Sequence, residues 1–410
     1  MIKKNISIIG LGYIGLPTAA ILADTGHKVL GVDINTDVVD GINSSKTHFY
    51  EPDLDELVIN NIKNGNLRAD IELDDSDIFI ICVPTPFKVD GNNKTPDMSY
   101  IEDASLEISK HIKKGDLVIL ESTSPVGTTQ KVAELIQNQV GDCNGMFFAY
   151  CPERVLPGNI ISELTDNDRI VGGLDNASTA IAADFYKTFV KGCIHLTNSN
   201  TAEMCKLTEN SYRDVNIAFA NELSLISEKY DIDERELIKL ANFHPRVDIL
   251  QPGVGVGGHC IAVDPWFLIS DSPNKTNLIR TAREVNIKKT EWVKEKVEEK
   301  IDDYKSKNGY EPLLACMGIT FKPNVDDIRE SPALEIALSI KNNYKQTLIV
   351  EPNLEKIDGV DLAKLNFALE KADIFVFLVG HNNFSKEDFL KKINKKDYLD
   401  FTGIVNFNKI

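Results

Sequence analysis

The feature that most constrains this chain is a glycine pattern close to its N-terminus. Residues 10–15 read Gly-Leu-Gly-Tyr-Ile-Gly; they follow an apolar run at 6–9 and precede an apolar pattern with helical spacing. A second apolar run, at 29–32, ends at Asp33. A strand, a glycine turn, a helix and a second strand that ends in an acidic residue begin a dinucleotide-binding unit.

Each position of this pattern has a physical task. Gly10 permits the tight turn, Gly12 lets the backbone approach a pyrophosphate, and Gly15 lets the helix pack closely on the strand. The N-terminus of the helix directs its N–H groups at the phosphates. The Asp33 carboxylate accepts hydrogen bonds from a ribose diol and repels a 2′-phosphate. We therefore predict NAD as the cofactor; the alternative is an ordinary glycine turn.

Strand-like runs alternate with helical patterns through the first half of the chain. After the two runs above they lie at 78–83, 117–121 and 146–149. This alternation predicts right-handed βαβ units and a parallel sheet. Pro84 and Thr85 follow one of these strands and Thr123 follows another, at the edge where open α/β sheets bind ligands. Plain turn chemistry explains the same residues equally well.

Long helices replace this alternation from about Asn198. Residues 200–203 resemble a capping box, with Asn200 as the cap, and open a helical pattern to about Tyr230, roughly 45 Å long. Such a helix suits a spine between domains or subunits. A helix rich in Lys and Glu follows from Asn286 to about Lys305. Four more strand-like runs lie at 313–320, 347–350, 374–379 and 398–401.

These patterns predict an α/β protein with two Rossmann-like, doubly wound domains joined by a central long-helix segment. The expected boundaries are 1–197 for the NAD-binding domain, 198–305 for the central segment and 306–410 for the second α/β domain.

Composition narrows the classes of partner. The 410 residues include 45 Lys and Arg against 62 Asp and Glu, a net charge of −17, which argues against nucleic-acid binding. The seven Cys residues form no C-x-x-C pair, and no His cluster has zinc spacing, so we expect no metal and a cytoplasmic location. The apolar runs are interrupted by glycines or too short to span a bilayer, so we expect no membrane insertion.

A polar stripe on the long helix is a candidate site. Lys206, Asn210 and Arg213 share one face of that helix. An amine, an amide and a guanidinium suit a polar, anionic ligand, although a polar helix stripe is often only solvated.

A glycine-rich loop supplies a candidate nucleophile. Four of residues 253–258 are glycine, and Cys260 follows them. Glycines let the backbone approach a ligand and direct N–H groups at a negative charge. Backbone donors or a nearby lysine would favour the Cys260 thiolate, so a nucleophile and a buried thiol both remain open. We expect His259 to be structural or orienting.

Two further basic segments flank this loop in sequence. Arg246 of a His-Pro-Arg turn (His244 to Arg246) is either a phosphate clamp or a surface charge. Lys322 and Arg329 precede a helix that Ser331 caps, with proline at its first position, which predicts a diphosphate site.

Taken together, these segments resemble the UDP-glucose/GDP-mannose dehydrogenase family over essentially the whole chain. The family-specific blocks lie at 10–15, 151–158, 201–224, 257–260 and 321–331. The run Gly-Gly-His-Cys-Ile-Ala-Val-Asp at 257–264 looks like the N-acetylated branch, and Ala262 favours UDP-N-acetyl-D-mannosamine over UDP-N-acetylglucosamine.

The resemblance implies oxidation of the C6 hydroxyl of UDP-N-acetyl-D-mannosamine to a carboxylate, with two NAD and no metal, by a homodimer or higher homo-oligomer. Cys260 would form a thiohemiacetal and then a thioester that water hydrolyses. The alternatives are another nucleotide sugar, a two-electron hydroxyacid dehydrogenase that needs no nucleophile, and a non-catalytic NAD-binding scaffold.

The resemblance also implies roles for individual residues. The catalytic set is Cys260, Lys206, Asn210, Asp264, Glu153 and Thr123. The cofactor set is Gly10, Gly12, Tyr13, Ile14, Gly15, Asp33, Pro84, Thr85, Thr123 and Arg329. The substrate set is Arg154, Val155, Lys206, Asn210, Arg213, His244, Arg246, Gly257, Phe321 and Lys322, of which a neighbouring subunit would supply His244 and Arg246.

Overall fold

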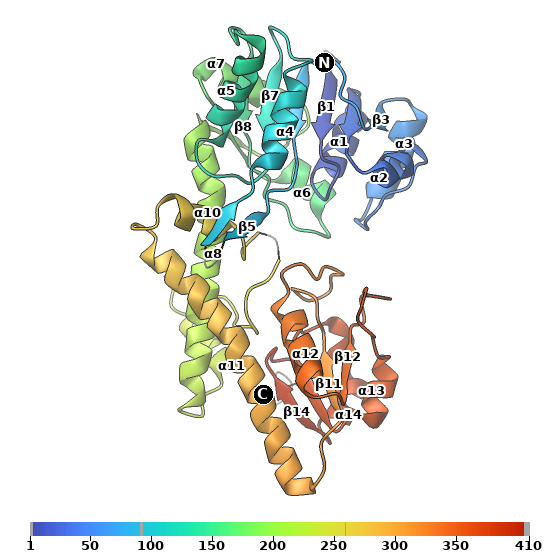
Figure 1. Cartoon of the computed structure of the whole chain (residues 1–410), viewed down its shortest axis with the longest axis vertical. Coiled ribbons are helices and arrows are strands. Elements are labelled where there is room, and N and C mark those ends of the chain that lie inside the picture. Colours follow the sequence, from blue (N-terminus) through green and yellow to red (C-terminus); the bar gives the residue numbers. More distant parts are fainter. Residues whose placement is uncertain (1–2, 91–92, 259, 406–410) are drawn as a thin grey trace. The chain divides into compact units, whose positions relative to one another are not determined.

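The computed structural model describes residues 3–90, 93–258 and 260–405. The chain divides into two compact units, Met1–Glu209 and Asn210–Ile410. Each unit is built around a mainly parallel sheet, and Figure 1 labels many of the elements of both.

The first unit contains an eight-stranded sheet in the order β10-β9-β8-β7-β4-β1-β2-β3. All neighbours pair in parallel except β8 and β9, which pair antiparallel. The strands are β1 (Asn5–Ile9), β2 (Lys28–Val32), β3 (Leu67–Asp70), β4 (Ile78–Ile81), β7 (Leu117–Leu120), β8 (Phe147–Tyr150), β9 (Arg169–Gly173) and β10 (Ile194–Asn198). A separate hairpin joins β5 (Phe87–Asp90) to β6 (Asn93–Pro96).

Helices cover both faces of this sheet because its central strands are apolar on both sides. In β4, Ile78 and Ile80 belong to one core cluster, while Phe79 and Ile81 belong to the other. The first cluster includes residues of α1 (Gly15–Asp24), α2 (Thr36–Asn43), α3 (Leu54–Lys63), α6 (Ile160–Asp166) and α7 (Asn176–Tyr186). The second includes residues of α4 (Ser99–Ile108) and α5 (Thr128–Val140).

The second unit combines helices with a smaller parallel sheet in the order β12-β11-β13-β14. The strands are β11 (Leu314–Met317), β12 (Thr347–Val350), β13 (Ile374–Phe377) and β14 (Asp397–Asp400). One face packs on α11 (Asn277–Asn308) and α12 (Pro332–Asn343), and the other on α13 (Leu365–Lys371) and α14 (Glu387–Ile393). The remaining helices are α8 (Ser199–Glu228), which begins in the first unit, α9 (Glu234–Ala241) and α10 (Asp264–Asp271).

The predicted fold class is confirmed, two local predictions need correction, and several strands were not predicted. The cap of α8 is Asn198, whose side chain accepts the N–H of Thr201, and Asn200 already lies inside the helix. The second long helix begins at Asn277, nine residues before the predicted start at Asn286. The strands β3, β9 and β10 and the β5–β6 hairpin were not predicted.

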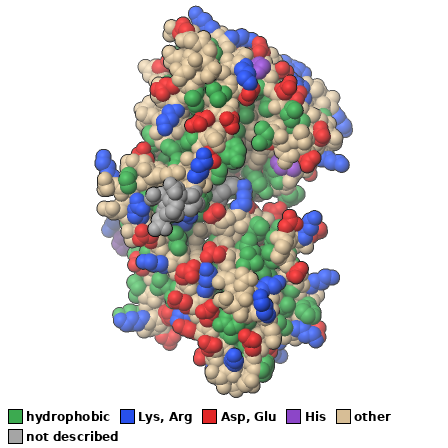
Figure 2. Space-filling model, viewed as in Figure 1, with side chains coloured by type: hydrophobic (Ala, Val, Ile, Leu, Met, Phe, Trp, Pro, Cys, Tyr) green, Lys and Arg blue, Asp and Glu red, His purple; other side chains and the backbone are tan. Residues whose placement is uncertain are grey.

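The surface of the folded chain is rich in charged side chains of both signs (Figure 2), as its composition predicts. On the face drawn in Figure 2, Lys and Arg side chains are interspersed with Asp and Glu side chains. Within the described ranges, every helix is too short or too polar to cross a bilayer.

Candidate active site

The glycine turn of the first unit has the shape that a bound pyrophosphate requires. Gly10 has φ +92°, and a Cβ at this position would lie 2.8 Å from the carbonyl oxygen of Cys82. A Cβ at Gly15 would lie 1.8 Å from the carbonyl oxygen of Gly10, so the helix can approach the turn only without a side chain there. At Gly12 a Cβ would meet no atom within 4 Å, which leaves this backbone open to a ligand.

Asp33 is fixed at the end of β2, next to this turn. Its two carboxylate oxygens accept the N–H groups of Leu11 and Asn35, each at 2.9 Å. The side chain is half-buried, and each oxygen retains a lone pair for a ribose hydroxyl. Open backbone at Gly12 and an anchored acceptor at Asp33 together fit NAD. Tyr13 and Ile14 lie half-buried in the same turn, with the Tyr13 ring 4.3 Å from that of Phe49.

The two loops predicted to extend this crevice lie side by side. The hydroxyl of Thr85 donates to the carbonyl oxygen of Thr123 at 2.6 Å, and the hydroxyl of Ser122 donates to that of Val83 at 2.7 Å. β4 and β7 are neighbours in the sheet, so both loops leave the same edge. The structure therefore brings together Pro84, Thr85 and Thr123, as the strand-end argument predicted.

Glu153 links several predicted site residues in the first unit. The Nζ of Lys206 donates to the carbonyl oxygen of Glu153 at 2.6 Å. One carboxylate oxygen of Glu153 accepts the N–H of Arg154 at 2.6 Å, and the other pairs with Arg169. Lys206 and Glu153 are thus in contact although 52 residues lie between them in the chain.

Arg169 was not among the predicted site residues. Its side chain is 2% exposed and that of Glu153 is 7% exposed, so their ion pair is buried. The guanidinium also lies 5.5 Å from the centre of the Tyr186 ring and donates to the carbonyl oxygen of Leu164. Arg169 is the first residue of β9, a short strand that reads Arg-Ile-Val-Gly-Gly and was not predicted, so no signal in the sequence pointed to it.

A second buried acid lies close to the same group. Glu121 accepts the hydroxyl of Tyr186 at 2.6 Å and the thiol of Cys82 at 3.3 Å. Burial raises the pKa of Glu121, the positive charge of Arg169 opposes that shift, and the negative charge of Glu153 adds to it. Arg169 therefore supplies the positive charge for two buried carboxylates.

The remaining substrate candidates of the first unit lie beside Glu153. Arg154 pairs with Glu209 at 3.1 Å and donates to the carbonyl oxygen of Asp168. Val155 packs against the first core cluster. Glu203, expected to belong to the cap of α8, is buried and instead accepts the N–H groups of Gly127 and Thr129 at the start of α5. Its carboxylate therefore anchors the loop that carries Thr123.

The second unit brings Cys260, Asp264 and Asn210 together. The N–H of Asp264 donates to the carbonyl oxygen of Cys260 at 2.8 Å, since Cys260 forms the turn that precedes α10. The amide of Asn210, on α8, donates to the carboxylate of Asp264. Asn210 is 5% exposed and Asp264 is 2% exposed, while Cys260 is half-buried. The backbone of a half-buried cysteine is thus tied to a buried amide–carboxylate pair, an arrangement that suits a nucleophile with polar groups nearby in the chain fold.

The glycine loop before Cys260 is held on several sides. The N–H of Gly253 donates to Asn221 of α8, and the hydroxyl of Thr290 of α11 donates to the carbonyl oxygen of Val254. The N–H of Gly258 donates to the carbonyl oxygen of Arg329 at 3.0 Å. These contacts hold the loop against α8, against α11 and against the backbone at Arg329.

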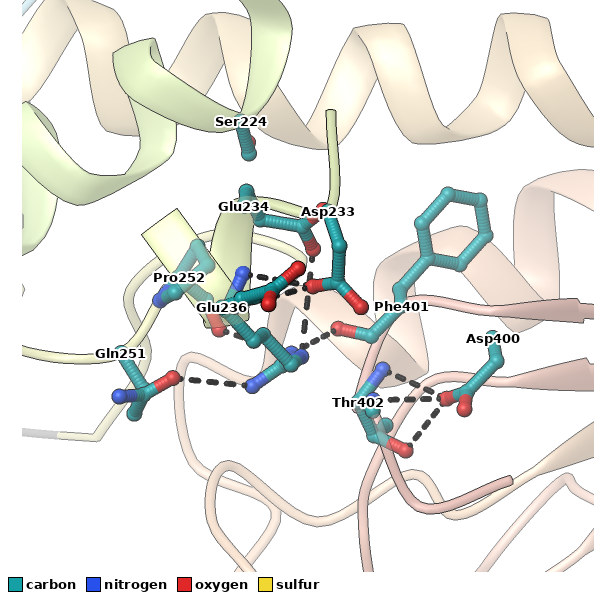
Figure 3. Close-up of polar contacts among 12 residues, drawn as sticks. Ser224, Asp233, Glu234, Glu236, Gln251, Pro252, Asp400, Phe401 and Thr402 are labelled. Atoms are coloured by element: carbon teal, nitrogen blue, oxygen red, sulfur yellow. Dashed lines mark hydrogen bonds and ion pairs between the residues drawn. The ribbon is translucent and has the colours of Figure 1, made fainter. Parts of the chain in front are cut away.

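The residues just before this loop join a second polar cluster. Arg235 donates to the side chain of Gln251 and to the carbonyl oxygens of Pro252 and Phe401. Figure 3 shows Gln251, Pro252 and Phe401 around this cluster, with Asp400 bonded to Thr402 nearby. The cluster ties the start of the Cys260 loop to the end of β14.

The nucleotide-side candidates fall into two groups. Phe321 and Gly257 pack against each other: a Cβ at Gly257 would lie 3.0 Å from the Cβ of Phe321. Lys322 follows in the same loop, and Arg329 pairs there with Asp327. Arg213, His244 and Arg246 form the second group. They are exposed, and none of them takes part in the hydrogen bonds described above for the Cys260 loop. The prediction for His259 lies outside the described residues.

In the part of the chain that the structure describes, no group of three or more His, Cys, Asp or Glu side chains is placed so that it could hold a metal ion.

Comparisons with known proteins identify the family. The NAD binding domain of the UDP-glucose/GDP-mannose dehydrogenase family matches residues 4–190, its central domain matches 200–288, and its UDP binding domain matches 315–406. The chain belongs to this family. It is an NAD-dependent nucleotide-sugar dehydrogenase, with NAD bound by the first domain and UDP by the last.

Individual relatives cover almost the whole chain. UDP-N-acetyl-D-mannosamine dehydrogenase of Campylobacter jejuni is 51% identical over 398 residues, which span 93% of this chain and 96% of the relative. NDP-N-acetyl-D-galactosaminuronic acid dehydrogenase of Ralstonia nicotianae is 47% identical, over 99% of this chain and 97% of the relative. The solved structure of UDP-D-ManNAc dehydrogenase from Pyrococcus horikoshii superimposes with a TM-score of 0.89 at 39% identity, over 98% of this chain and 96% of that one.

Proposed function

We propose that this chain oxidises the C6 hydroxyl of UDP-N-acetyl-D-mannosamine to UDP-N-acetyl-D-mannosaminuronate and consumes two NAD per sugar. The observation that carries this proposal is the contact set of Cys260, Asp264 and Asn210, because a two-electron dehydrogenase needs no nucleophile there. The 51% identical relative from Campylobacter jejuni supports the choice of sugar.

Cys260 acts as the covalent nucleophile in this proposal. Bound NAD supplies the hydride acceptor for both oxidations. The C6 alcohol first loses its hydroxyl proton and a hydride from C6, which gives the aldehyde. The thiolate adds to this aldehyde and forms a C–S bond and an alkoxide; loss of a second hydride from C6 then leaves a thioester. Water attacks the thioester carbon, the C–S bond breaks, and the carboxylate and the thiolate are released.

Neighbouring side chains stabilise the charged species. Asn210 is a neutral amide donor, held by Asp264, and it stabilises the oxyanion that forms at C6. Lys206, one helical turn before Asn210 on α8, is a second donor and the general base for the hydroxyl. Asp264, Glu153 and Thr123 order water and relay protons. Arg169 supports Glu153 in that role because it holds one of its two carboxylate oxygens.

The remaining site residues bind the cofactor and the nucleotide sugar. Gly10, Gly12, Tyr13, Ile14, Gly15, Asp33, Pro84, Thr85 and Arg329 hold NAD, and Arg154, Val155, Arg213, His244, Arg246, Gly257, Phe321 and Lys322 hold UDP-sugar. Their basic members concentrate positive charge for diphosphates in a chain of net charge −17.

An apolar stripe on α8 supports a homodimer or higher homo-oligomer. Tyr212, Phe219 and Ile226 recur every seven residues and are 63%, 50% and 51% exposed. Such a stripe on a long helix suits packing against a second copy. In that assembly the exposed His244 and Arg246 belong to the neighbouring subunit's site.

Three functional segments follow from this reading: 1–197 binds NAD, 198–305 is the central helical segment with the Cys260 loop, and 306–410 binds the UDP-sugar. We propose the cytoplasm as the location of the protein.

A substrate panel tests the proposal. NADH formation is followed with UDP-N-acetyl-D-mannosamine, UDP-N-acetylglucosamine, UDP-N-acetylgalactosamine, UDP-glucose and GDP-mannose. The proposal requires the highest kcat/KM with the mannosamine sugar. A higher value with any of the other four would overturn the choice of sugar, and the 47% identical Ralstonia relative makes galactosamine the sharpest competitor.

A further inference from the structure

The loop that carries Phe321, Lys322 and Arg329 rests on a buried His–Glu pair to which the reaction above gives no role. We call residues 318–331 the nucleotide loop. Glu351 directly follows β12, and His381 follows β13, so both stand at the carboxyl ends of the two strands that flank β11 in the small sheet. Both side chains are 0% exposed. A buried ionisable pair at this edge, the usual ligand edge of an α/β sheet, calls for an explanation.

Glu351 accepts hydrogen bonds from four donors. One oxygen accepts the N–H of Ile319 at 2.8 Å, the N–H of Thr320 at 3.3 Å and the ring Nε2 of His381 at 3.1 Å. The other oxygen accepts the N–H of Asn353 at 3.0 Å. Every neighbour is a donor, so this position requires a group that only accepts.

His381 holds the far corner of the same loop. Its Nδ1 accepts the backbone N–H of Asn324 at 3.0 Å, and the side-chain amide of Asn353 lies 2.8 Å from the same nitrogen. Because a backbone N–H can only donate, Nδ1 is the acceptor, and the ring proton sits on Nε2, towards Glu351. Asn324 has φ +61°, in the left-handed region that asparagine tolerates better than most non-glycine residues.

The nucleotide loop in turn supports the Cys260 loop. Its Arg329 carbonyl oxygen accepts the N–H of Gly258 at 3.0 Å. A Cβ at Gly257 would lie 2.5 Å from the carbonyl oxygen of Glu330, so the two backbones are in close contact. The carbonyl oxygen of Lys322 accepts the hydroxyl of Thr320 at 2.9 Å. The nucleotide loop therefore carries Lys322 within residues 319–324 and contacts the backbone next to Cys260 through Arg329 and Glu330.

We propose that His381 and Glu351 are positioning residues for the nucleotide sugar: they hold residues 319–324 of the nucleotide loop in the shape that binds the UDP moiety. Neither side chain touches the ligand in this account; each acts through backbone N–H groups of the loop. The kinetic arm of the test below rests on the proposed function, whereas the UDP-binding arm does not.

The test compares four variants of the full chain. His381→Phe keeps a ring of similar shape and removes both nitrogens, and Glu351→Gln keeps the shape but points an amide donor at surrounding donors. His381→Asn retains an acceptor near the Nδ1 position. Phe389→Leu is the matched control, since Phe389 is buried in the same domain and packs on Phe377 and Phe384 rather than on the nucleotide loop. For each protein, UDP affinity is measured by titration calorimetry, together with KM for the sugar, KM for NAD, kcat and the melting temperature.

We expect His381→Phe and Glu351→Gln to weaken UDP binding and raise the sugar KM about tenfold, with the NAD KM changed less than about twofold. His381→Asn should recover most of the UDP affinity. Phe389→Leu should lower the melting temperature and leave the UDP affinity at the wild-type value. Wild-type UDP affinity in both His381→Phe and Glu351→Gln would overturn the inference. An equal loss in Phe389→Leu would also overturn it, because general destabilisation would then suffice. If the wild type binds UDP but oxidises none of the sugars, the proposed function fails while the binding comparison still decides this inference.

Discussion

Lys289 of α11 is a buried lysine whose charge should make stability depend on pH. It is 3% exposed, donates to the hydroxyl of Ser224 at 2.8 Å, and lies 3.7 Å from the centre of the Trp292 ring. Burial lowers its pKa from 10.5 to about 7; Glu234 and Glu228 oppose that shift, and Arg235 adds to it. Figure 3 shows Ser224 and Glu234 of this environment.

The sign of the effect follows from the protons that each state binds. Between about pH 7 and pH 10.5 the unfolded chain keeps the Lys289 proton and the folded chain releases it, so the free energy of unfolding rises with pH. The slope is about 1.4 kcal/mol per pH unit, which gives about 2 to 3 kcal/mol between pH 7 and pH 9. Lys289→Met removes the titrating group and therefore loses this gain.

The assay is denaturant unfolding of the wild type and Lys289→Met at about pH 6, 7.5 and 9, because every other titrating group cancels in the difference. The free energy of the variant relative to the wild type should fall by about 2 to 3 kcal/mol across this range. Lys294→Met on the same helix is the control: burial opposes the shift, but hydrogen bonds to Glu291 and Glu335 raise the pKa of Lys294 above 10.5, outside the range. A difference for Lys289→Met that does not change with pH would refute the reasoning.

Three further substitutions test the site. Cys260→Ala should abolish formation of the sugar acid while NAD affinity, measured by fluorescence titration, stays at the wild-type value; acid production by this variant would remove the nucleophile. Asp33→Ala should raise the KM for NAD about tenfold and leave the sugar KM within about twofold, since one charged acceptor is lost; equal changes in both would contradict a ribose contact. Arg169→Met leaves Glu153 buried without its partner and should lower the free energy of unfolding by about 3 to 5 kcal/mol, read from urea unfolding, together with kcat. Wild-type stability in that variant would mean that the Arg169–Glu153 pair contributes nothing to the folded state.

The parts of the fold that were predicted correctly are those with uninterrupted local signals. The strand β4 reads Ile-Phe-Ile-Ile and is buried on both faces, so its apolar run is visible in the sequence. The turn at 10–15 was also predicted correctly, because its glycines are required by local geometry. A Cβ at Gly10 or Gly15 would clash with the backbone, and the open space at Gly12 is where a ligand can approach. Strands with polar residues were missed: β10 reads Ile-His-Leu-Thr-Asn and is largely exposed at the sheet edge.

The parts of the site that were not predicted depend on contacts between distant residues. Arg169 pairs with Glu153, which lies 16 positions away in the sequence, and Glu203 accepts a hydrogen bond from Thr129, which lies 74 positions away. Glu203 even matched a local capping pattern, and the structure uses its carboxylate on another helix instead. His381 carried no motif at all; only the fold places it under Asn324. Local patterns identify residue types suited to a chemistry, whereas the partner of a buried charge is decided by tertiary packing.

The central claim, four-electron oxidation through a Cys260 thioester, is tested most directly by counting electrons. A limiting, known amount of UDP-N-acetyl-D-mannosamine is converted to completion with excess NAD, and NADH is measured by its absorbance. The account predicts two NADH for each sugar consumed, with the uronic acid as the final product. One NADH per sugar, with the aldehyde as the product, would contradict it.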